Sequence, residues 1–273
     1  MPIAAFLAIL VATAVAPQPA PWRVLEPGLE LLVWAPRGVT AAGDSTVHVL
    51  RIDPERFDLR LLNASAPDQG AAHSARDWSR LNGLVAATNA GMYQTDLRTS
   101  VALMRSDTHV NNPRLTRDKA VLAFAPRDTS LPPVQIIDRE RQDFERLRRG
   151  YTTLVQGIRM VSLDGRNTWA SQPRAWSTAA IAMDKAGRVL LIHVRAPYVT
   201  HELIEVLLSL PLDLKNAMYL EGGPEAQLYV HAGGVELERL GAYGSGFAVA
   251  DENAAAWPVP NVIGVVRRKP TQR

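Results

Sequence analysis

Two short apolar segments each end in a polar side chain followed by glycine. Residues 84–88 (LVAAT) lead into Asn89-Ala90-Gly91, and residues 217–220 (AMYL) lead into Glu221-Gly222-Gly223. Each apolar run is typical of a buried strand. Glycine lacks a Cβ and permits a sharp turn or close approach of a ligand, and ligands often bind where strands end. We therefore expect Asn89 and Glu221 to face one cleft. Two ordinary strand-ending turns are the alternative.

A third apolar segment, residues 151–155, also ends in a polar residue and glycine, here Gln156-Gly157, and Arg159 follows. The guanidinium of Arg159 has the planar fork that binds phosphate or carboxylate, with a surface ion pair as the alternative. Arg174-Ala175-Trp176-Ser177 precedes a hairpin signal. Trp176 is a candidate platform for a sugar ring, and core packing is its simpler interpretation.

Several familiar chemistries are absent from the sequence. It contains no cysteine, which excludes disulfides, thiolate metal sites and a cysteine nucleophile. It also contains no phosphate-binding glycine loop, no H-E-x-x-H and no G-x-S-x-G. The six histidines show no short ligand spacing. His193 in a strand and His201 at a helix start are expected to be structural, although both are placed to reach one cleft.

The net charge of +3 is distributed over interspersed charges of both signs. The densest basic run, residues 139–149, also contains three acidic side chains and indicates a solvated helix rather than a nucleic-acid patch. Aromatic residues are sparse and do not alternate with basic ones. We expect no nucleic-acid partner.

The N-terminal residues 3–15 are apolar, uncharged and too short to span a bilayer comfortably. Ala14-Val15-Ala16 fits the small-residue cleavage pattern of a secretory signal. We expect a signal peptide over residues 1–20, a single domain over 21–273, and a periplasmic or secreted product. A membrane-tethered N-terminus is the alternative. No later segment is long and apolar enough to cross a membrane.

The elements that would position these residues alternate without a repeat or a linker. Residues 73–81 are predicted to form a helix capped by Ser74, and residues 201–210 a helix capped by Thr200. Asp184-Lys185-Ala186-Gly187 indicates a hairpin between residues 178–183 and 188–194. Further strands are predicted at 29–34, 45–52, 57–62, 121–124, 134–137 and 261–267. The predicted fold is a mixed α/β (α+β) domain, with a mixed β-sheet core and flanking helices.

The order of these motifs resembles that of the phosphodiester glycosidase family. The resemblance rests on the segments N-A-G-M-Y at 89–93, Q-G-x-R-M at 156–160, the hairpin 180–187, Y-L-E-G-G at 219–223 and V-P-N-V-I at 259–263. It covers roughly residues 45–267. It implies an exported α/β domain that hydrolyses a sugar-1-phosphodiester in envelope or extracellular glycans. Two departures are the threonine, Thr178, where many relatives carry arginine, and Glu221 where aspartate is commoner.

The chemistry of this reaction assigns roles to the candidate residues. Breaking the C1–O bond builds positive charge on the sugar and negative charge on the departing phosphate, so a carboxylate and anion-stabilising donors are needed. Glu221 is the first candidate for the catalytic carboxylate and Asp96 the second. The candidate substrate-binding residues are Asn89, Gly91, Gln156, Arg159, Arg174, Ser177, His193, Gly222 and Gly223.

We expect a phosphorylated glycan or sugar phosphodiester as substrate and no cofactor. Two other functions stay open. One is a glycan-binding envelope protein without catalysis. The other is a phosphodiesterase that uses a divalent metal ion held by Asp96, Glu221 and His193.

Overall fold

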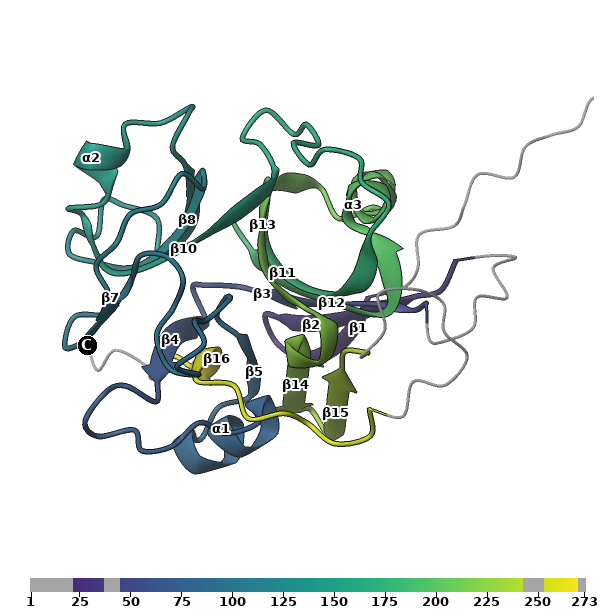
Figure 1. Ribbon diagram of the computed structural model, residues 1–273, viewed down its shortest axis with the longest axis horizontal. Helices are drawn as coiled ribbons and strands as arrows, with labels where there is room; N and C mark the ends of the chain where they lie inside the picture. Colours follow the sequence, from purple (N-terminus) through teal and green to yellow (C-terminus); the bar gives the residue numbers. More distant parts are fainter. Residues whose placement is uncertain (1–21, 37–44, 243–252, 270–273) are drawn as a thin grey trace, which may run out of the picture.

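The computed structural model describes residues 22–36, 45–242 and 253–269, and these form two antiparallel β-sheets (Figure 1). The predicted signal peptide, residues 1–20, lies outside the described residues. Every strand pair among the described residues is antiparallel. No helix in these ranges is both long enough and apolar enough to span a membrane.

The larger sheet follows the order β1-β2-β3-β12-β11-β13-β10-β6-β7, and β8 also pairs with β10 and with β9. Its strands are β1 (Arg23–Glu26), β2 (Leu29–Trp34), β3 (Val47–Ile52), β6 (Met104–Arg105), β7 (Val110–Asn112), β8 (Ala120–Pro126), β9 (Val134–Asp138), β10 (Tyr151–Val161), β11 (Ala175–Asp184), β12 (Val189–Val199) and β13 (Leu214–Gly222).

The smaller sheet follows the order β15-β14-β5-β16-β4. Its strands are β4 (Phe57–Asn63), β5 (Ala86–Asn89), β14 (Gln227–Ala232), β15 (Val235–Leu240) and β16 (Asn261–Arg267). A short 3-10 helix, η1 (Gly223–Glu225), joins β13 of the larger sheet to β14 of the smaller one. Residues just after Glu221 therefore lie where the chain passes between the sheets.

The main core lies between the two sheets. Leu50, Ile181 and Leu191 of the larger sheet pack in one buried cluster with Val230 and Ile263 of the smaller sheet. Alternate residues of the larger sheet point the other way and form a second cluster with the apolar face of α3 (Thr200–Ser209). The central strands are thus buried on both faces, which explains their almost continuous apolar sequence.

Local sequence signals account for much of the element order. Ser74 Oγ accepts a hydrogen bond from Asp77 N and caps α1 (Ala75–Asn82), as predicted. The hairpin forms between β11 and β12, with Gly187 at a φ of 86°. In α3, however, the predicted cap is wrong. The N-cap residue is Val199, and Thr200 lies inside the first turn.

The predicted fold class is also wrong. The described residues are predominantly strand, with two antiparallel sheets and three α-helices, of which α2 (Phe144–Leu147) is a single turn. The prediction failed because the central strands have almost continuous apolar sequences. Strands buried on both faces are typical of parallel sheets with crossover helices, but here the second sheet and α3 cover an antiparallel sheet joined by hairpins. The predicted helix over residues 139–149 is also too long, because only α2 within it is helical and the rest is turn or irregular.

Candidate active site

The two glycine turns identified in the sequence lie beside each other. Gly91 has a φ of 132°, in the region that favours glycine. A Cβ on Gly91 would lie 3.9 Å from the carbonyl oxygen of Leu220, the residue before Glu221. The backbone after β5 and the backbone at the end of β13 therefore meet at one place, although Gly91 and Leu220 are 129 positions apart in the sequence.

Glu221 is the most strongly perturbed carboxyl group at this place. Burial, and to a lesser degree the charge of Glu225, raise its pKa to about 7. A hydrogen bond of 3.0 Å from Gly222 N to Glu221 Oε1 works in the opposite direction and holds the carboxylate in position. Glu221 is therefore able to gain and lose a proton near neutral pH, as a general base or acid must.

Two further residues belong to this cluster and were not predicted. Burial raises the pKa of Glu225 in η1, whose charge acts on Glu221. Burial, together with the charges of Glu225 and Glu221, raises the pKa of Tyr93 to about 12. Tyr93 therefore keeps its hydroxyl proton near neutral pH. The sequence did offer a signal for both residues, because Tyr93 lies two residues after Gly91 and Glu225 lies two residues after Gly223.

Gly222 allows aromatic side chains to close around the end of β13. A Cβ on Gly222 would lie 2.2 Å from Tyr219 Oη and 2.6 Å from Trp176 Cδ1. Tyr219 also contacts Trp169, with ring centroids 5.3 Å apart. Gly223 has a φ of 66°, and a Cβ there would lie 3.4 Å from Glu225 Oε2. The two glycines thus permit the turn that brings Glu225 back toward Glu221.

Asn89 supplies a buried amide donor near the same turns. Its side chain is 1 % exposed, and its Oδ1 accepts a hydrogen bond of 3.0 Å from Gln227 N, just beyond η1. Its Nδ2 has no hydrogen-bond partner among the described residues. Because a buried unpaired N–H is costly, this amide is available to an acceptor on a bound molecule.

Ser177 and His193 hold the surrounding backbone. Ser177 Oγ accepts a hydrogen bond of 2.7 Å from Ala242 N and donates one to Arg195 O. His193 is fully buried, and its Nε2 lies 3.2 Å from Ala226 O, at the end of η1. Burial lowers the pKa of His193 to about 3, so its ring is neutral near pH 7. His193 thus holds the end of η1, and Ser177 links β11 to Arg195 and Ala242.

Gln156 has an internal role. The strand that was predicted to end before it continues as β10 to Val161. Its Oε1 accepts from Thr116 N at 3.0 Å and from Leu103 N at 3.4 Å. Its Nε2 donates to the carbonyl oxygens of Thr116 and Asp118, at 3.2 Å and 2.8 Å. Because both atoms already have two partners, the side chain has no capacity left for a sugar hydroxyl.

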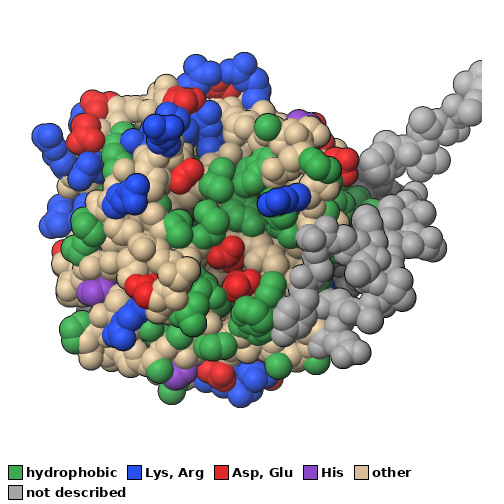
Figure 2. Space-filling model, viewed as in Figure 1, with side chains coloured by type: hydrophobic (Ala, Val, Ile, Leu, Met, Phe, Trp, Pro, Cys, Tyr) green, Lys and Arg blue, Asp and Glu red, His purple; other side chains and the backbone are tan. Residues whose placement is uncertain are grey.

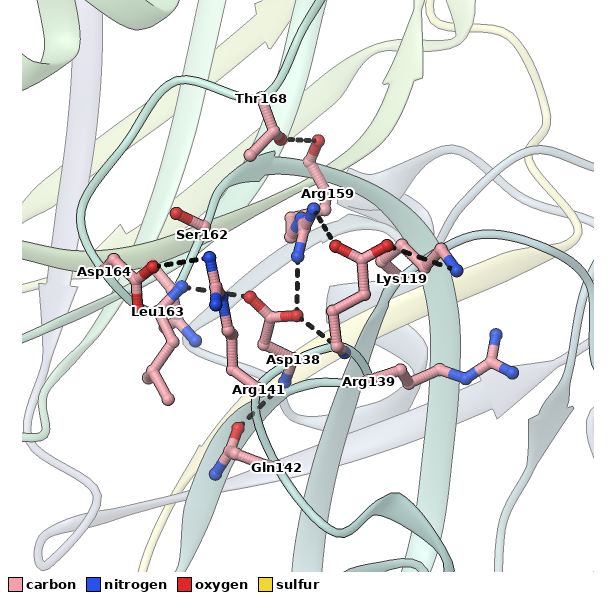
Figure 3. A network of polar contacts seen from close by, with 12 residues as sticks. Lys119, Asp138, Arg139, Arg141, Gln142, Arg159, Ser162, Leu163, Asp164 and Thr168 are labelled. Atoms are coloured by element: carbon pink, nitrogen blue, oxygen red, sulfur yellow. Dashed lines mark hydrogen bonds and ion pairs between the residues drawn. The ribbon is translucent and has the colours of Figure 1, made fainter.

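Arg159 is engaged in an ion-pair network (Figure 3). Its guanidinium contacts Asp138 Oδ1 and Glu140 Oε2, each at 2.7 Å. Asp138 is 1 % exposed and also accepts hydrogen bonds from Glu140 N and Leu163 N. Arg159 thus forms ion pairs within the protein, which was the alternative to phosphate binding. Its guanidinium faces protein carboxylates.

The remaining candidates are exposed. Asp96 accepts hydrogen bonds from Arg98 N, Thr99 N and Thr99 Oγ1, and the bonds from Thr99 hold the pKa of Asp96 below its ordinary value. This is the arrangement of a side chain that stabilises its own turn. Arg174 is exposed just before β11. No described contact joins either residue to Glu221.

One face of the molecule has an uneven distribution of charged side chains. Figure 2 shows acidic side chains in the middle of the face, bordered by hydrophobic ones, whereas Lys and Arg lie mainly toward the margin. Carboxyl groups in apolar surroundings have raised pKa values.

Comparison with known proteins gives a family and a fold. A family model described as phosphodiester glycosidase matches residues 82–266, which include both glycine turns and the Glu221 cluster. No functionally curated protein shows significant sequence similarity to the chain.

Three solved structures share the fold at low sequence identity. The catalytic domain of zebrafish N-acetylglucosamine-1-phosphodiester alpha-N-acetylglucosaminidase, auto-inhibited by its pro-peptide, aligns over 92% of this chain and 87% of its own, with 14% identity and a TM-score of 0.63. A hypothetical protein from Synechocystis aligns over 88% and 62%, with 16% identity and a TM-score of 0.57. A protein from Burkholderia pseudomallei described as exported aligns over 81% and 74%, with 12% identity and a TM-score of 0.52.

Proposed function

This chain belongs to the phosphodiester glycosidase family, and we propose that it hydrolyses a sugar-1-phosphodiester, breaking the bond between sugar C1 and the phosphate oxygen. The observation that carries the proposal is the cluster of Glu221, Glu225 and Tyr93 at the two glycine turns. Hydrolysis of a glycosidic bond uses two carboxyl groups held in different environments, of which one has a raised pKa.

The geometry supports a division of roles between the two carboxyl groups. With a pKa of about 7, Glu221 is matched to proton transfer near neutral pH. We assign it as the base that takes a proton from the attacking water, whose oxygen forms the new bond to C1. The carboxyl group of Glu225, whose charge acts on Glu221, is assigned to stabilise the positive charge that builds on the sugar ring. The bond from C1 to the phosphate oxygen breaks, and the phosphomonoester leaves with its electron pair.

Neutral donors near the turns serve the departing phosphate and the sugar hydroxyls. The Asn89 Nδ2 group is buried without a partner in the described part of the chain, and Tyr93 keeps its proton. Oriented donors of this kind stabilise developing negative charge. Arg174, exposed before β11, is the arginine that we propose as a further contact to the phosphate, because Arg159 is held by Asp138 and Glu140.

We further propose that the substrate is a phosphorylated glycan of the cell envelope or the extracellular space, and that the protein is periplasmic or secreted. Support comes from the apolar N-terminal residues with their small-residue cleavage pattern. The fold shared with a protein described as exported agrees with this location.

Carboxylate-to-amide variants test the proposal directly. Turnover of a panel of sugar-1-phosphodiesters should fall roughly 100-fold or more in Glu221→Gln, the scale of positioned acid–base catalysis. Glu221→Asp should lose less, because the charge remains. Asp96→Asn is the matched control and should retain near-normal turnover. Normal turnover in Glu221→Gln combined with inactive Asp96→Asn would transfer the catalytic role to Asp96.

The metal-dependent alternative needs three ligands in one place. The described residues contain no group of three His, Asp or Glu side chains arranged to hold a metal ion. Of the three candidates, His193 bonds to Ala226 O and Asp96 bonds within its own turn. Assays with a chelator, followed by addition of a divalent ion, decide between the two mechanisms.

A further inference from the structure

A second feature that suggests binding lies at the opposite end of β13 from Glu221. A cavity of about 280 Å³ is bordered by the β3–β4 turn, the start of β9, the β11–β12 turn and the start of β13, where Asn216 lies. Asn216 and Glu221 are five residues apart on this strand. At about 3.3 Å per residue, they are separated by roughly 17 Å. The cavity is therefore distinct from the candidate active site.

Asn216 lines this cavity and has an acceptor atom without a partner in the described part of the chain. The residue is 2 % exposed, and its Nδ2 donates a hydrogen bond of 2.8 Å to Ile136 O. That bond fixes the orientation of the carboxamide. Its Oδ1 is buried and has no partner within the described ranges. A buried acceptor without a donor is costly, so a molecule that supplies an O–H or N–H group would be stabilised here.

Two more carboxamides line the same cavity, and each forms a short hydrogen bond to the protein through one of its atoms. Gln135 Nε2 donates to Tyr151 Oη at 2.7 Å, and Gln142 Oε1 accepts from Asp138 N at 2.9 Å. The contact between Gln142 Nε2 and Gln135 Oε1 is long, at 3.5 Å. Each side chain therefore keeps donor or acceptor capacity. Hydroxyl groups, which donate and accept, complement such a set.

The charges around the cavity balance. Its lining contains the acidic residues Asp53 and Glu55 and the basic residues Arg188 and Lys215. Arg188 is already paired with Asp184 at 2.6 Å. The remaining walls are mostly proline and aliphatic side chains. A neutral molecule with hydroxyl groups and apolar C–H faces fits this environment better than an anion.

We propose that this cavity binds one residue of a neutral saccharide, as a second carbohydrate site of the protein. Its volume lies just below the ~300 Å³ at which small-ligand sites begin, so it suits a single ring. This assignment rests on the proposed function, which supplies the idea of a glycan substrate. A second carbohydrate site would allow the protein to hold a longer glycan than the active site alone. Binding at the cavity itself requires no hydrolysis at Glu221.

Nuclear magnetic resonance of the full-length protein tests the site. The Asn216 side-chain amide signal is followed while methyl glycosides of glucose, mannose, galactose and N-acetylglucosamine are added. At least one glycoside should shift this signal in a saturable way. Ala186 is exposed in the β11–β12 turn and lines the cavity, so Ala186→Trp should block it and weaken binding at least about tenfold.

Matched variants separate this result from the outcome at Glu221. Ala71→Trp, at an exposed alanine that does not line the cavity, should bind like the unchanged protein. Glu221→Gln should also keep glycoside binding at Asn216, whether or not hydrolysis is observed. The proposal is overturned if no glycoside moves the Asn216 signal, in which case a water molecule satisfies Oδ1. It is equally overturned if Ala186→Trp binds normally, or if only inorganic phosphate shifts the signal.

Discussion

Replacing Glu221 by glutamine should stabilise the protein at alkaline pH. The pKa of Glu221 in the folded protein is about 7, compared with an ordinary value of 4.5. The folded state therefore binds this proton more tightly than the unfolded state does. The resulting stabilisation is fully present below about pH 4.5 and is lost as the pH rises through 7.

The size of the effect follows from the two pKa values. A difference between about 7 and 4.5 corresponds to about 3 kcal/mol, which is an upper limit because the side chain is only partly enclosed. Glutamine has no charge to bury and keeps an oxygen for the Gly222 N–H group. The variant should therefore equal the unchanged protein near pH 4.5 and exceed it by up to about 3 kcal/mol at pH 8.

Urea unfolding at a series of pH values measures this difference. Each pH compares the two proteins directly, so titration of all other groups cancels to first order. The expected result is a free-energy difference that grows between pH 5 and pH 8, together with loss of turnover. A difference that stays constant with pH would refute the raised pKa and with it the assignment of Glu221 as the base.

Three other variants test the surrounding residues. Glu225→Gln should move the acidic limb of the pH–rate profile to lower pH, because removal of the Glu225 charge lowers the pKa of Glu221; an unmoved limb would show that the two groups do not interact. Asn89→Ala should lower turnover per folded molecule and also cost about 1–3 kcal/mol of stability in thermal unfolding, because a buried backbone N–H loses its acceptor; full activity per folded molecule would reduce Asn89 to a structural residue. Arg159→Ala should cost about 3 kcal/mol in the same assay, because it leaves a buried carboxylate unpaired, and should leave KM nearly unchanged; a stable variant with a greatly raised KM would restore its role in phosphate binding.

The sequence predicted individual elements better than their arrangement. The Ser74 cap and the hairpin at 184–187 are local signals, and both are confirmed. The sheet arrangement depends on whether helices or a second sheet cover each face of a sheet. A strand such as β12 is apolar on both sides in both cases. Periodicity alone therefore could not distinguish two antiparallel sheets from a sheet flanked by helices.

In the site, too, the sequence predicted local features better than their spatial arrangement. The glycine turns at Asn89 and Glu221 were recognised because their chemistry is visible in a few consecutive residues, and the structure places these turns together. Gln156-Gly157 has the same local pattern, but here the glycine lets β10 approach β13, where a Cβ would lie 2.7 Å from Tyr219 O. Glu225 was missed because only the turn of η1 brings its charge to Glu221.

The position of bond cleavage tests the central claim most directly. The unchanged protein is incubated with a sugar-1-phosphodiester in water enriched in oxygen-18, and both products are examined by mass spectrometry. Hydrolysis at C1 with water activated by Glu221 predicts oxygen-18 in the released sugar and an unlabelled phosphomonoester. Oxygen-18 in the phosphate would instead show attack at phosphorus, and the protein would then be a phosphodiesterase rather than a glycosidase.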